Sequence, residues 1–582
     1  MKKILTTWKL LLAMLLAVTA PLEASANEMY GNTSSEYAIK VGDFGYFFYK
    51  SYDVPGQTLT NVCTMVLYDG YTETAVLPDT AEFQGVKFPV VGIDWRFRED
   101  NHVKCCKQLT IPASVIVIEQ GAFNDIDQIT HLTFKDGPNP IYCYDCGSRH
   151  SRYGAFTYMD GLQEVYLGRE LAWDYSEYDQ APFYRNNDGS YFNVTVGPQV
   201  NTIHYHTFDH ARVKGVTFLE SEATISIEED AFNDTDIEVW QQYRNVTGSQ
   251  PCKANSDLHV IRIGGQVTYI RDNEFQDCHN VWEANLTEAA KLETIGEHAF
   301  EDCDDVTEVF IPKSVTKIGY EAFYDMDDLK KITFEDSKTP LDMTGGFVFY
   351  GYDGYSKELQ EVYLGRTLNL KSGNENYEFA DRNNITTVTI GPGCEEIPNK
   401  LFQNCHKVSV VDFSKATSLK RIGQHAFEDC DEVTAITIPQ NVKWIGYEAF
   451  YDMDKLVSIV IEDSPETLDM WEGAQFRAYD NKSGVLKSVY MGRNLMVDPD
   501  GYQKDNFYNR QITSVAFSRY VTDIPKNLFH NNPFASITFE LGAGPLSIGE
   551  GALVGDGNTT ISSITIPTAV SYIGKDAFYD SI

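Results

Sequence analysis

The sequence predicts a β-rich solenoid, in which short strands and short turns form coils that stack into a single elongated body with inserted loops. Two observations carry this prediction. Ile295 to Leu329 reads IGEHAFEDCDDVTEVFIPKSVTKIGYEAFYDMDDL, and Ile422 to Leu456, 127 residues later, reads IGQHAFEDCDEVTAITIPQNVKWIGYEAFYDMDKL. A shorter unit recurs inside each block, because IGEHAF and IGYEAF lie 23 residues apart. Such periods are typical of stacked, nearly one-dimensional folds rather than of a globule with one central site.

The first part of each unit is predicted to be a strand. Its pattern is apolar-x-x-apolar-x-apolar, often followed by proline, as in the stretch from Val433 to Pro439. Because alternate strand residues face opposite sides, Ile436 and Ile438 should point inward and Thr437 outward. The proline cannot donate a backbone hydrogen bond, so strand pairing should stop there.

The second part of each unit is predicted to be a return turn, with short helical or 3-10 geometry. It reads Ile-Gly-x-x-Ala-Phe, and an acidic stretch and a Cys or Met follow. Glycines such as Gly319 and Gly446 are expected to permit the tight bend. The phenylalanines should stack into one interior column, and each buried ring should contribute about 1.5–3 kcal/mol. This column is expected to contain Phe300, Phe323, Phe427, Phe450 and Phe578.

The chain is expected to contain three segments. Residues 1–26 have the features of an export signal, with Lys2, Lys3 and Lys9 before a short apolar run and Ala24-Ser25-Ala26 at the cleavage point. Residues 27–100 are expected to form an N-terminal β segment and first-turn cap. Residues 101–582 are expected to form the repeat solenoid, with a super-repeat at about 264–390 and 391–517 and partial further copies.

The chain is strongly acidic, with a formal net charge of −37. Removal of residues 1–26 leaves 44 basic and 83 acidic residues, or −39. This balance argues against nucleic acid and against anionic membrane surfaces as partners, because both attract Lys and Arg. The apolar run of the export signal is too short to span a bilayer, and no other stretch qualifies, so no integral membrane segment is expected.

Most of the eleven cysteines are expected to be buried thiols. Cys278 and Cys405 occupy equivalent repeat positions, as do Cys303 and Cys430, and sister units place Met at the same point, which indicates an interior slot rather than a bridge. Cys143-x-x-Cys146 allows a redox pair, half a zinc site or a local disulfide.

The sequence offers no enzyme centre. A phosphate loop after a strand, HExxH and GxSxG are all absent, and so is a calcium loop. His204, His206 and His210 cluster in the sequence, but without ligands at matching spacing they are interpreted as turn and surface residues. No cofactor and no metal site are therefore expected.

The best candidates for ligand contact are outward positions of the predicted strands. Most carry threonine, which β-propensity alone explains. Three carry tyrosine, and each tyrosine is followed by Leu or Met, then Gly and Arg. In the predicted register, one of these tyrosines lies between Thr333 and Thr389. An exposed aromatic residue with an arginine nearby is a pattern that interfaces favour. The candidate ligand-binding residues are Tyr166, Arg169, Tyr363, Arg366, Tyr490 and Arg493.

The repeat unit resembles the leucine-rich repeats of BspA-like surface proteins of anaerobic bacteria. Residues Ile311 to Leu329 carry the pattern IPxSVTxIGxxAFxxCxxL, with Met in place of Cys. Thr74 to Ile93 looks like the first turn of that family, where a short hairpin precedes the repeats. The resemblance implies a leucine-rich-repeat solenoid and an exported protein, extracellular or at the cell surface, with outer-membrane association included. It also implies binding to host proteins or other bacteria.

These observations together predict a non-catalytic binding protein, an adhesin or interaction module whose ligand is a protein or glycan on a host or bacterial surface. A structural spacer or surface-layer component is the first alternative, because repeat number alone would then matter. A hydrolase built on a β-solenoid is the second alternative.

Overall fold

A computed structural model describes residues 28–29, 39–98, 105–144, 154–173, 181–184, 190–351, 358–371, 378–478, 486–498, 506–508, 510–540 and 544–581. The expected export signal and Cys146 lie outside these residues. The chain divides into two compact units, unit 1 (Met1–Cys252) and unit 2 (Lys253–Ile582).

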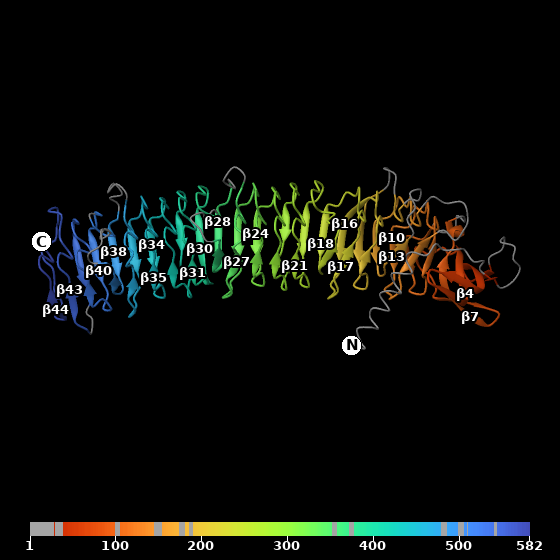
Figure 1. Cartoon of the computed structure of the whole chain (residues 1–582), viewed down its shortest axis with the longest axis horizontal. Coiled ribbons are helices and arrows are strands. Elements are labelled where there is room, and N and C mark those ends of the chain that lie inside the picture. Colours follow the sequence, from red (N-terminus) through yellow and green to blue (C-terminus); the bar gives the residue numbers. More distant parts are fainter. Residues whose placement is uncertain are drawn as a thin grey trace, which may run out of the picture. The chain divides into compact units, whose positions relative to one another are not determined.

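Unit 1 begins with antiparallel strands and continues as parallel coils (Figure 1). β3 pairs antiparallel with β1, β2 and β4, and β4 then opens a parallel ladder that continues through β7, β9, β11 and β13. A second parallel ladder joins β5, β8, β10, β12, β14, β16 and β18, and a third joins β15, β17 and β19. The strands are β1 Glu28–Met29, β2 Ile39–Val41, β3 Phe44–Val54, β4 Gln57–Tyr68, β5 Thr74–Val76, β6 Thr80–Phe83, β7 Val86–Ile93, β8 Gln108–Ile111, β9 Val117–Glu119, β10 His131–Phe134, β11 Ile141–Tyr144, β12 Glu164–Leu167, β13 Leu171–Trp173, β14 Phe192–Val196, β15 Thr202–Ile203, β16 Val213–Phe218, β17 Ile225–Ile227, β18 Val239–Gln242 and β19 Val246–Gly248.

The hairpin expected before the repeats is present. β6 pairs antiparallel with β7, and Phe83 lies opposite Val86. The two residues between them, Gln84 and Gly85, have φ values of 52° and 77°. Two consecutive positive φ values define the tight turn that matches the twist of paired strands. A 3-10 helix, η1 (Trp95–Arg98), follows, and the described residues contain no other helix.

Unit 2 repeats a two-strand coil (Figure 1). Longer strands form three ladders, β20 with β22, β24 to β32 and β34 to β42, and shorter strands form the ladders β21 to β29, β31 to β39 and β41 to β44. The strands are β20 Val260–Ile263, β21 Tyr269–Ile270, β22 Glu283–Asn285, β23 Thr294–Ile295, β24 Glu308–Ile311, β25 Lys317–Ile318, β26 Lys331–Phe334, β27 Leu341–Met343, β28 Glu361–Arg366, β29 Leu368–Leu370, β30 Thr387–Gly393, β31 Glu396–Ile397, β32 Val410–Asp412, β33 Arg421–Ile422, β34 Ala435–Ile438, β35 Trp444–Ile445, β36 Ser458–Ile461, β37 Leu468–Asp469, β38 Ser488–Met491, β39 Leu495–Met496, β40 Ser514–Phe517, β41 Asp523–Ile524, β42 Ser536–Phe539, β43 Leu546–Ile548 and β44 Val570–Ile573.

The longer-strand ladders of unit 2 are interrupted after β22 and after β32. These strands end at Asn285 and Asp412, which are equivalent positions of the super-repeat. The Asn285 Oδ1 accepts the Thr287 N–H at 3.0 Å, and the Asp412 Oδ1 accepts the Ser414 N–H at 2.8 Å. Because such side-chain turns compete with strand geometry, both strands end early, and the super-repeat is visible as separate ladders.

The interior of each unit contains a column of stacked phenylalanines, as predicted. In unit 2 each ring stacks on the ring of the next coil, with centroids 5.2 Å apart for Phe300 and Phe323 and 5.5 Å apart for Phe427 and Phe450. Phe578 differs from the expectation: it is half-buried, and the coil before it carries Leu553 at the column position. The rings in sequence are Phe97, Phe123, Phe156, Phe183, Phe208 and Phe232 in unit 1, and Phe275, Phe300, Phe323, Phe349, Phe379, Phe402, Phe427, Phe450, Phe476, Phe507 and Phe529 in unit 2.

The return turns use glycine differently from the expectation. Gly319 has no positive φ; the left-handed residue of its turn is Glu321, with φ 54°. A Cβ at Gly319 would instead lie 2.6 Å from the backbone nitrogen of Glu297 in the preceding coil. Gly446 shows the same relation to Gln424. Glycine is therefore required for the close approach of stacked backbones, and not for the bend itself.

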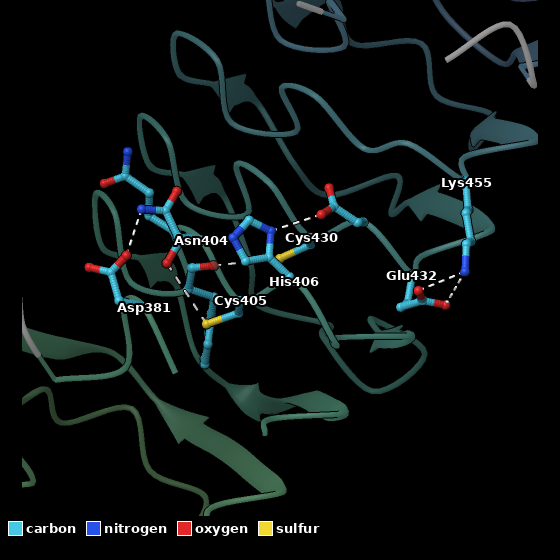
Figure 2. A network of polar contacts seen from close by, with 10 residues as sticks. Asp381, Asn404, Cys405, His406, Cys430, Glu432 and Lys455 are labelled. Atoms are coloured by element: carbon cyan, nitrogen blue, oxygen red, sulfur yellow. Dashed lines mark hydrogen bonds and ion pairs between the residues drawn. The ribbon is translucent and has the colours of Figure 1, made fainter. Parts of the chain in front are cut away.

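The repeat cysteines are interior thiols, as predicted. Cys278, Cys303, Cys405 and Cys430 are all buried, and no disulfide involves the described cysteines. Figure 2 shows Cys405 and Cys430 beneath polar turns, in which Asn404 donates to Asp381 at 2.6 Å. Burial raises the pKa of Cys405 to about 12, so this thiol is a packing group rather than a nucleophile. Cys143 is also a buried thiol.

Candidate functional site

The three candidate tyrosines lie at equivalent places on the outer side of the longer strands. Tyr363 lies on β28 between Thr333 and Thr389, as the predicted register requires. Its ring is half-buried, and its hydroxyl donates to Asp336 Oδ1 at 2.8 Å. Burial, followed by the hydrogen bond to Asp336, raises the pKa of Tyr363 to about 12. The ring face therefore remains outward, while the hydroxyl is tied to the preceding coil.

The other two tyrosines have the same arrangement. The Tyr166 hydroxyl donates to Asp136 at 2.8 Å, and the Tyr490 hydroxyl donates to Asp463 at 2.7 Å. The aspartates were not among the candidates from sequence. Their signal is positional, because each stands two residues after the end of the preceding longer strand.

The three candidate arginines lie in the interior. Their place in the motif predicts a surface position beside the tyrosines, but this prediction is wrong: Arg169, Arg366 and Arg493 are among the most deeply buried side chains, at 0–1 % exposure. The Arg366 guanidinium donates to the carbonyls of Val315 at 2.6 Å and Pro312, which belong to the coil two positions earlier. Burial lowers its pKa to about 10, which leaves it protonated at neutral pH.

The same contacts recur for the other two arginines and for a fourth. Arg169 donates to the carbonyls of Val115 and Pro112, and Arg493 donates to those of Val442 and Pro439. Arg244, which sequence reasoning did not select, donates to Val200 and Gly197. Each arginine therefore connects three coils and satisfies carbonyls that the turn after a strand leaves unpaired.

The fold itself explains the recurring Tyr-Leu-Gly-Arg motif of unit 2. The leucine is buried, and a Cβ at Gly365 would lie 2.2 Å from the carbonyl oxygen of Phe334. Tyrosine fixes the outer edge of the coil, glycine permits close stacking, and arginine fills the interior. The motif thus has a structural role whether or not the tyrosine ring contacts a ligand.

The outer side of the longer strands in unit 2, named here the strand face, contains shallow hollows. One of about 270 Å³ is lined by Tyr363 together with Lys331, Glu361, and three threonines and a valine of the adjacent strands. The Lys415 ammonium lies 5.8 Å from the centroid of the Tyr363 ring. Aromatic, cationic and anionic groups therefore converge around one of the candidate tyrosines.

A second hollow opens where the ladders separate after β32. It measures about 420 Å³, and its polar lining includes Asp412, Ser414, Thr437 and Gln440. A third, of about 600 Å³, shares Gln440 with it and is lined by charged residues such as Lys420. Sequence reasoning missed these residues because a gap between ladders depends on the stacking of distant coils.

The histidines of unit 1 do not converge on one point. His204 lies 3.4 Å from Glu228 and 3.8 Å from Glu170, whereas His206 pairs with Asp209 at 2.8 Å. His210 contacts Asp209 at 2.7 Å and Asp234 at 3.4 Å. The structure thus pairs these histidines with separate or shared carboxylates.

Several solved structures resemble the chain. A leucine-rich repeat protein from Bacteroides ovatus is 16% identical, with 81% of this chain and 94% of that chain covered and a TM-score of 0.32. A leucine rich cell surface protein from Faecalibacterium prausnitzii is 15% identical, with 82% and 98% covered and a TM-score of 0.24. The pneumococcal vaccine antigen PcpA is 15% identical, with 84% and 94% covered and a TM-score of 0.23.

A comparison with curated proteins finds no match. In the described part of the chain, no helix has the length and apolar character needed to cross a bilayer. The profile of the BspA type leucine rich repeat region matches residues 101–238, 181–280, 250–352, 355–472 and 502–582. These matches cover well over half of the sequence and coincide with the parallel coils of both units. The chain therefore belongs to the BspA-type leucine-rich-repeat family.

Proposed function

We propose that this protein is a non-catalytic binding protein of the bacterial surface or its surroundings, an adhesin or interaction module for host proteins, other bacteria or glycans. The strand face of unit 2 is its contact surface. In this proposal the rings of Tyr166, Tyr363 and Tyr490 contact the ligand. Arg169, Arg366 and Arg493 act from inside by fixing the coils that present those rings.

The observation that carries the proposal is the hollow around Tyr363. A tyrosine ring, the Lys331 ammonium and the Glu361 carboxylate line a depression of about 270 Å³. A shallow surface of this kind suits a protein surface or a sugar ring better than an enclosed small molecule, because small-molecule sites bury most of the ligand. Tyrosine gives a rigid contact area, and its ring can stack on a sugar or an apolar side chain.

A family-level consideration supports the absence of catalysis. Leucine-rich-repeat solenoids typically present surfaces for binding. The titratable groups on the strand face pair with backbone or with one another across neighbouring coils, as Tyr363 does with Asp336.

The test begins with purified full-length protein on arrays of host extracellular proteins and of glycans. The strongest ligand is then titrated against the wild type and against Y363A/Y490A. We expect a loss of affinity of at least tenfold, because hot-spot aromatics commonly contribute about 2 kcal/mol or more. W471A is the matched control, since Trp471 is 51% exposed and follows a shorter strand, away from the strand face.

Two outcomes would contradict the proposal. Unchanged affinity in Y363A/Y490A would remove the tyrosines from the contact surface. Absence of any array ligand, together with loss of surface architecture on deletion of residues 264–390, would favour the spacer. Turnover of a polysaccharide that a single carboxylate substitution abolishes would favour the hydrolase.

A further inference from the structure

Two clusters of one histidine and two glutamates lie in the return turns of unit 2. His298, Glu301 and Glu321 form the first, and the second consists of His425, Glu428 and Glu448. In each cluster the three potential ligand atoms lie within 4.8 Å of one another. The clusters are 127 residues apart and therefore occupy the same position of the super-repeat.

Stacking of adjacent turns creates each cluster. His298 and Glu321 are equivalent residues of neighbouring coils, and both adopt φ 54°. The His298 N–H donates to the Tyr320 carbonyl at 2.9 Å, so the two left-handed residues are held side by side. The common backbone conformation projects both side chains in the same direction. Glu301, three residues after the histidine, completes the cluster from the same turn.

The distances within the clusters fit ligands of one small cation. The Nδ1 of His298 lies 2.7 Å from Glu301 Oε2 and 3.4 Å from Glu321 Oε2. The corresponding distances from His425 are 2.7 Å to Glu428 and 3.6 Å to Glu448. Two ligand atoms on a tetrahedral Zn²⁺ with bonds of about 2.1 Å are roughly 3.4 Å apart, so a small rearrangement suffices.

Neighbouring groups hold the ligands in place. The Gln276 side-chain amide donates to Glu301 at 2.7 Å from the preceding coil, and Gln403 donates to Glu428 at 2.6 Å. Such hydrogen bonds to ligating carboxylates are a common feature of metal sites. The clusters are accessible from solvent, because the side chains of His298, Glu301 and Glu321 are 27%, 14% and 17% exposed.

The electrostatics also favour a cation. Two carboxylates face one imidazole nitrogen, and even a protonated histidine leaves the cluster with a net negative charge. The 35-residue stretches that begin at Ile295 and Ile422 differ at ten positions, yet both clusters keep all three residues.

We propose that His298, Glu301 and Glu321, and separately His425, Glu428 and Glu448, bind one divalent transition-metal ion each, with Zn²⁺ as the best fit. Imidazole nitrogen with two carboxylate oxygens suits Zn²⁺, whereas Ca²⁺ and Mg²⁺ favour all-oxygen shells. Three protein ligands leave one position for water or for an acidic or histidine side chain of a partner. Each ion would connect two successive coils.

The two sites should differ in affinity. The equivalent position in the preceding coil is Asn273 for the first cluster and Lys400 for the second. A lysine near the ligands opposes a cation, so the His298 site should bind more tightly.

The experiment is calorimetric titration of metal-free full-length protein with ZnCl₂, in buffer that contains excess Mg²⁺ to occupy non-specific acidic sites. We expect two Zn²⁺ per chain for the wild type, one for H298A, one for H425A and none for H298A/H425A. Co²⁺ should give the visible absorption of a low-coordinate site in the wild type and not in the double variant. E321Q/E448Q, which keeps side-chain size, should also lose both ions.

The matched control is H279A/H406A. These histidines recur at the same spacing, but each pairs with a single aspartate, Asp304 or Asp431, at 2.7 Å and 2.8 Å. This control removes the same number of imidazoles and should still bind two Zn²⁺. The proposal is overturned if the wild type binds no Zn²⁺, or if H298A/H425A, folded by circular dichroism, binds as many ions as the control.

Discussion

Substitution of Arg366 by methionine is expected to destabilise the middle of unit 2. Methionine retains most of the side-chain volume but donates no hydrogen bond. The carbonyls of Val315, Pro312 and Glu335 would lose their donor, and the first two have no room for water beside a fully buried side chain. Hydrogen bonds from a charged donor contribute about 1.5–3 kcal/mol each, so the two closest bonds together account for about 3–6 kcal/mol.

Relief of the buried charge offsets part of this loss. Removing a guanidinium from a low-dielectric interior recovers desolvation free energy of a few kcal/mol, although the fixed carbonyls stay buried. The expected net loss for R366M is therefore about 2–4 kcal/mol in the free energy of local opening. R366K should fall between, because a compact ammonium cannot reach all three acceptors.

The assay is native-state hydrogen exchange of the amides in β24 to β28, because a repeat protein need not unfold in one step. K420M is the control, since Lys420 forms an exposed pair with Glu395 at 2.7 Å and should contribute about 0–1 kcal/mol. Equal protection in R366M and K420M would refute the idea that the buried arginines hold the coils together.

Three further predictions follow from the core, the turns and a titrating histidine. F323A should cost about 3–5 kcal/mol in urea unfolding, because it opens a cavity in the ring column. G319A should lower the midpoint of thermal unfolding, because its Cβ would lie 2.6 Å from the backbone of the preceding coil. Burial lowers the pKa of His204, but the hydrogen bond to Glu170 and the charges of Glu228 and Glu170 outweigh it and raise the pKa overall. The resulting stability should be complete below the unfolded-state pKa of about 6.5 and be lost as pH rises through the folded-state value, so H204Q should flatten the stability profile above about pH 6.5.

Each of these predictions has an internal control. F310A truncates a half-buried ring on the strand face and should cost clearly less than F323A. G544A adds a methyl group whose closest neighbour is 3.6 Å away, and the same fall in midpoint for both glycine variants would contradict the close-stacking argument. An unchanged slope of stability against pH in H204Q would exclude His204 as the titrating group.

The coil and its interior could be predicted from sequence because they depend on local periodicity. Strand alternation correctly indicates that Ile436 and Ile438 are buried, and the repeated Ala-Phe pair correctly locates the ring column. The equivalence of Cys with Met identifies buried thiols by the same reasoning.

The placement of the arginines could not be predicted in this way. A charged residue next to an outward tyrosine is ordinarily assigned to the surface, because arginine is seldom fully buried. Its burial depends on unpaired carbonyls 51 and 54 residues earlier in the sequence, as for Arg366 with Val315 and Pro312. The histidine–glutamate clusters were missed for a related reason: their spacing of 3 and 23 residues is meaningful only once the coil length is known.

The interruptions of the longer-strand ladders have a consequence for how such a chain can change its length. Within unit 2, backbone pairing along these strands stops after β22 and again after β32, at equivalent points of the 127-residue block. A cassette removed or duplicated between those points leaves every remaining ladder with its own partners. Recombination at these seams would alter the reach of the molecule without a folding defect, whereas a cut inside a five-strand ladder would expose raw edges.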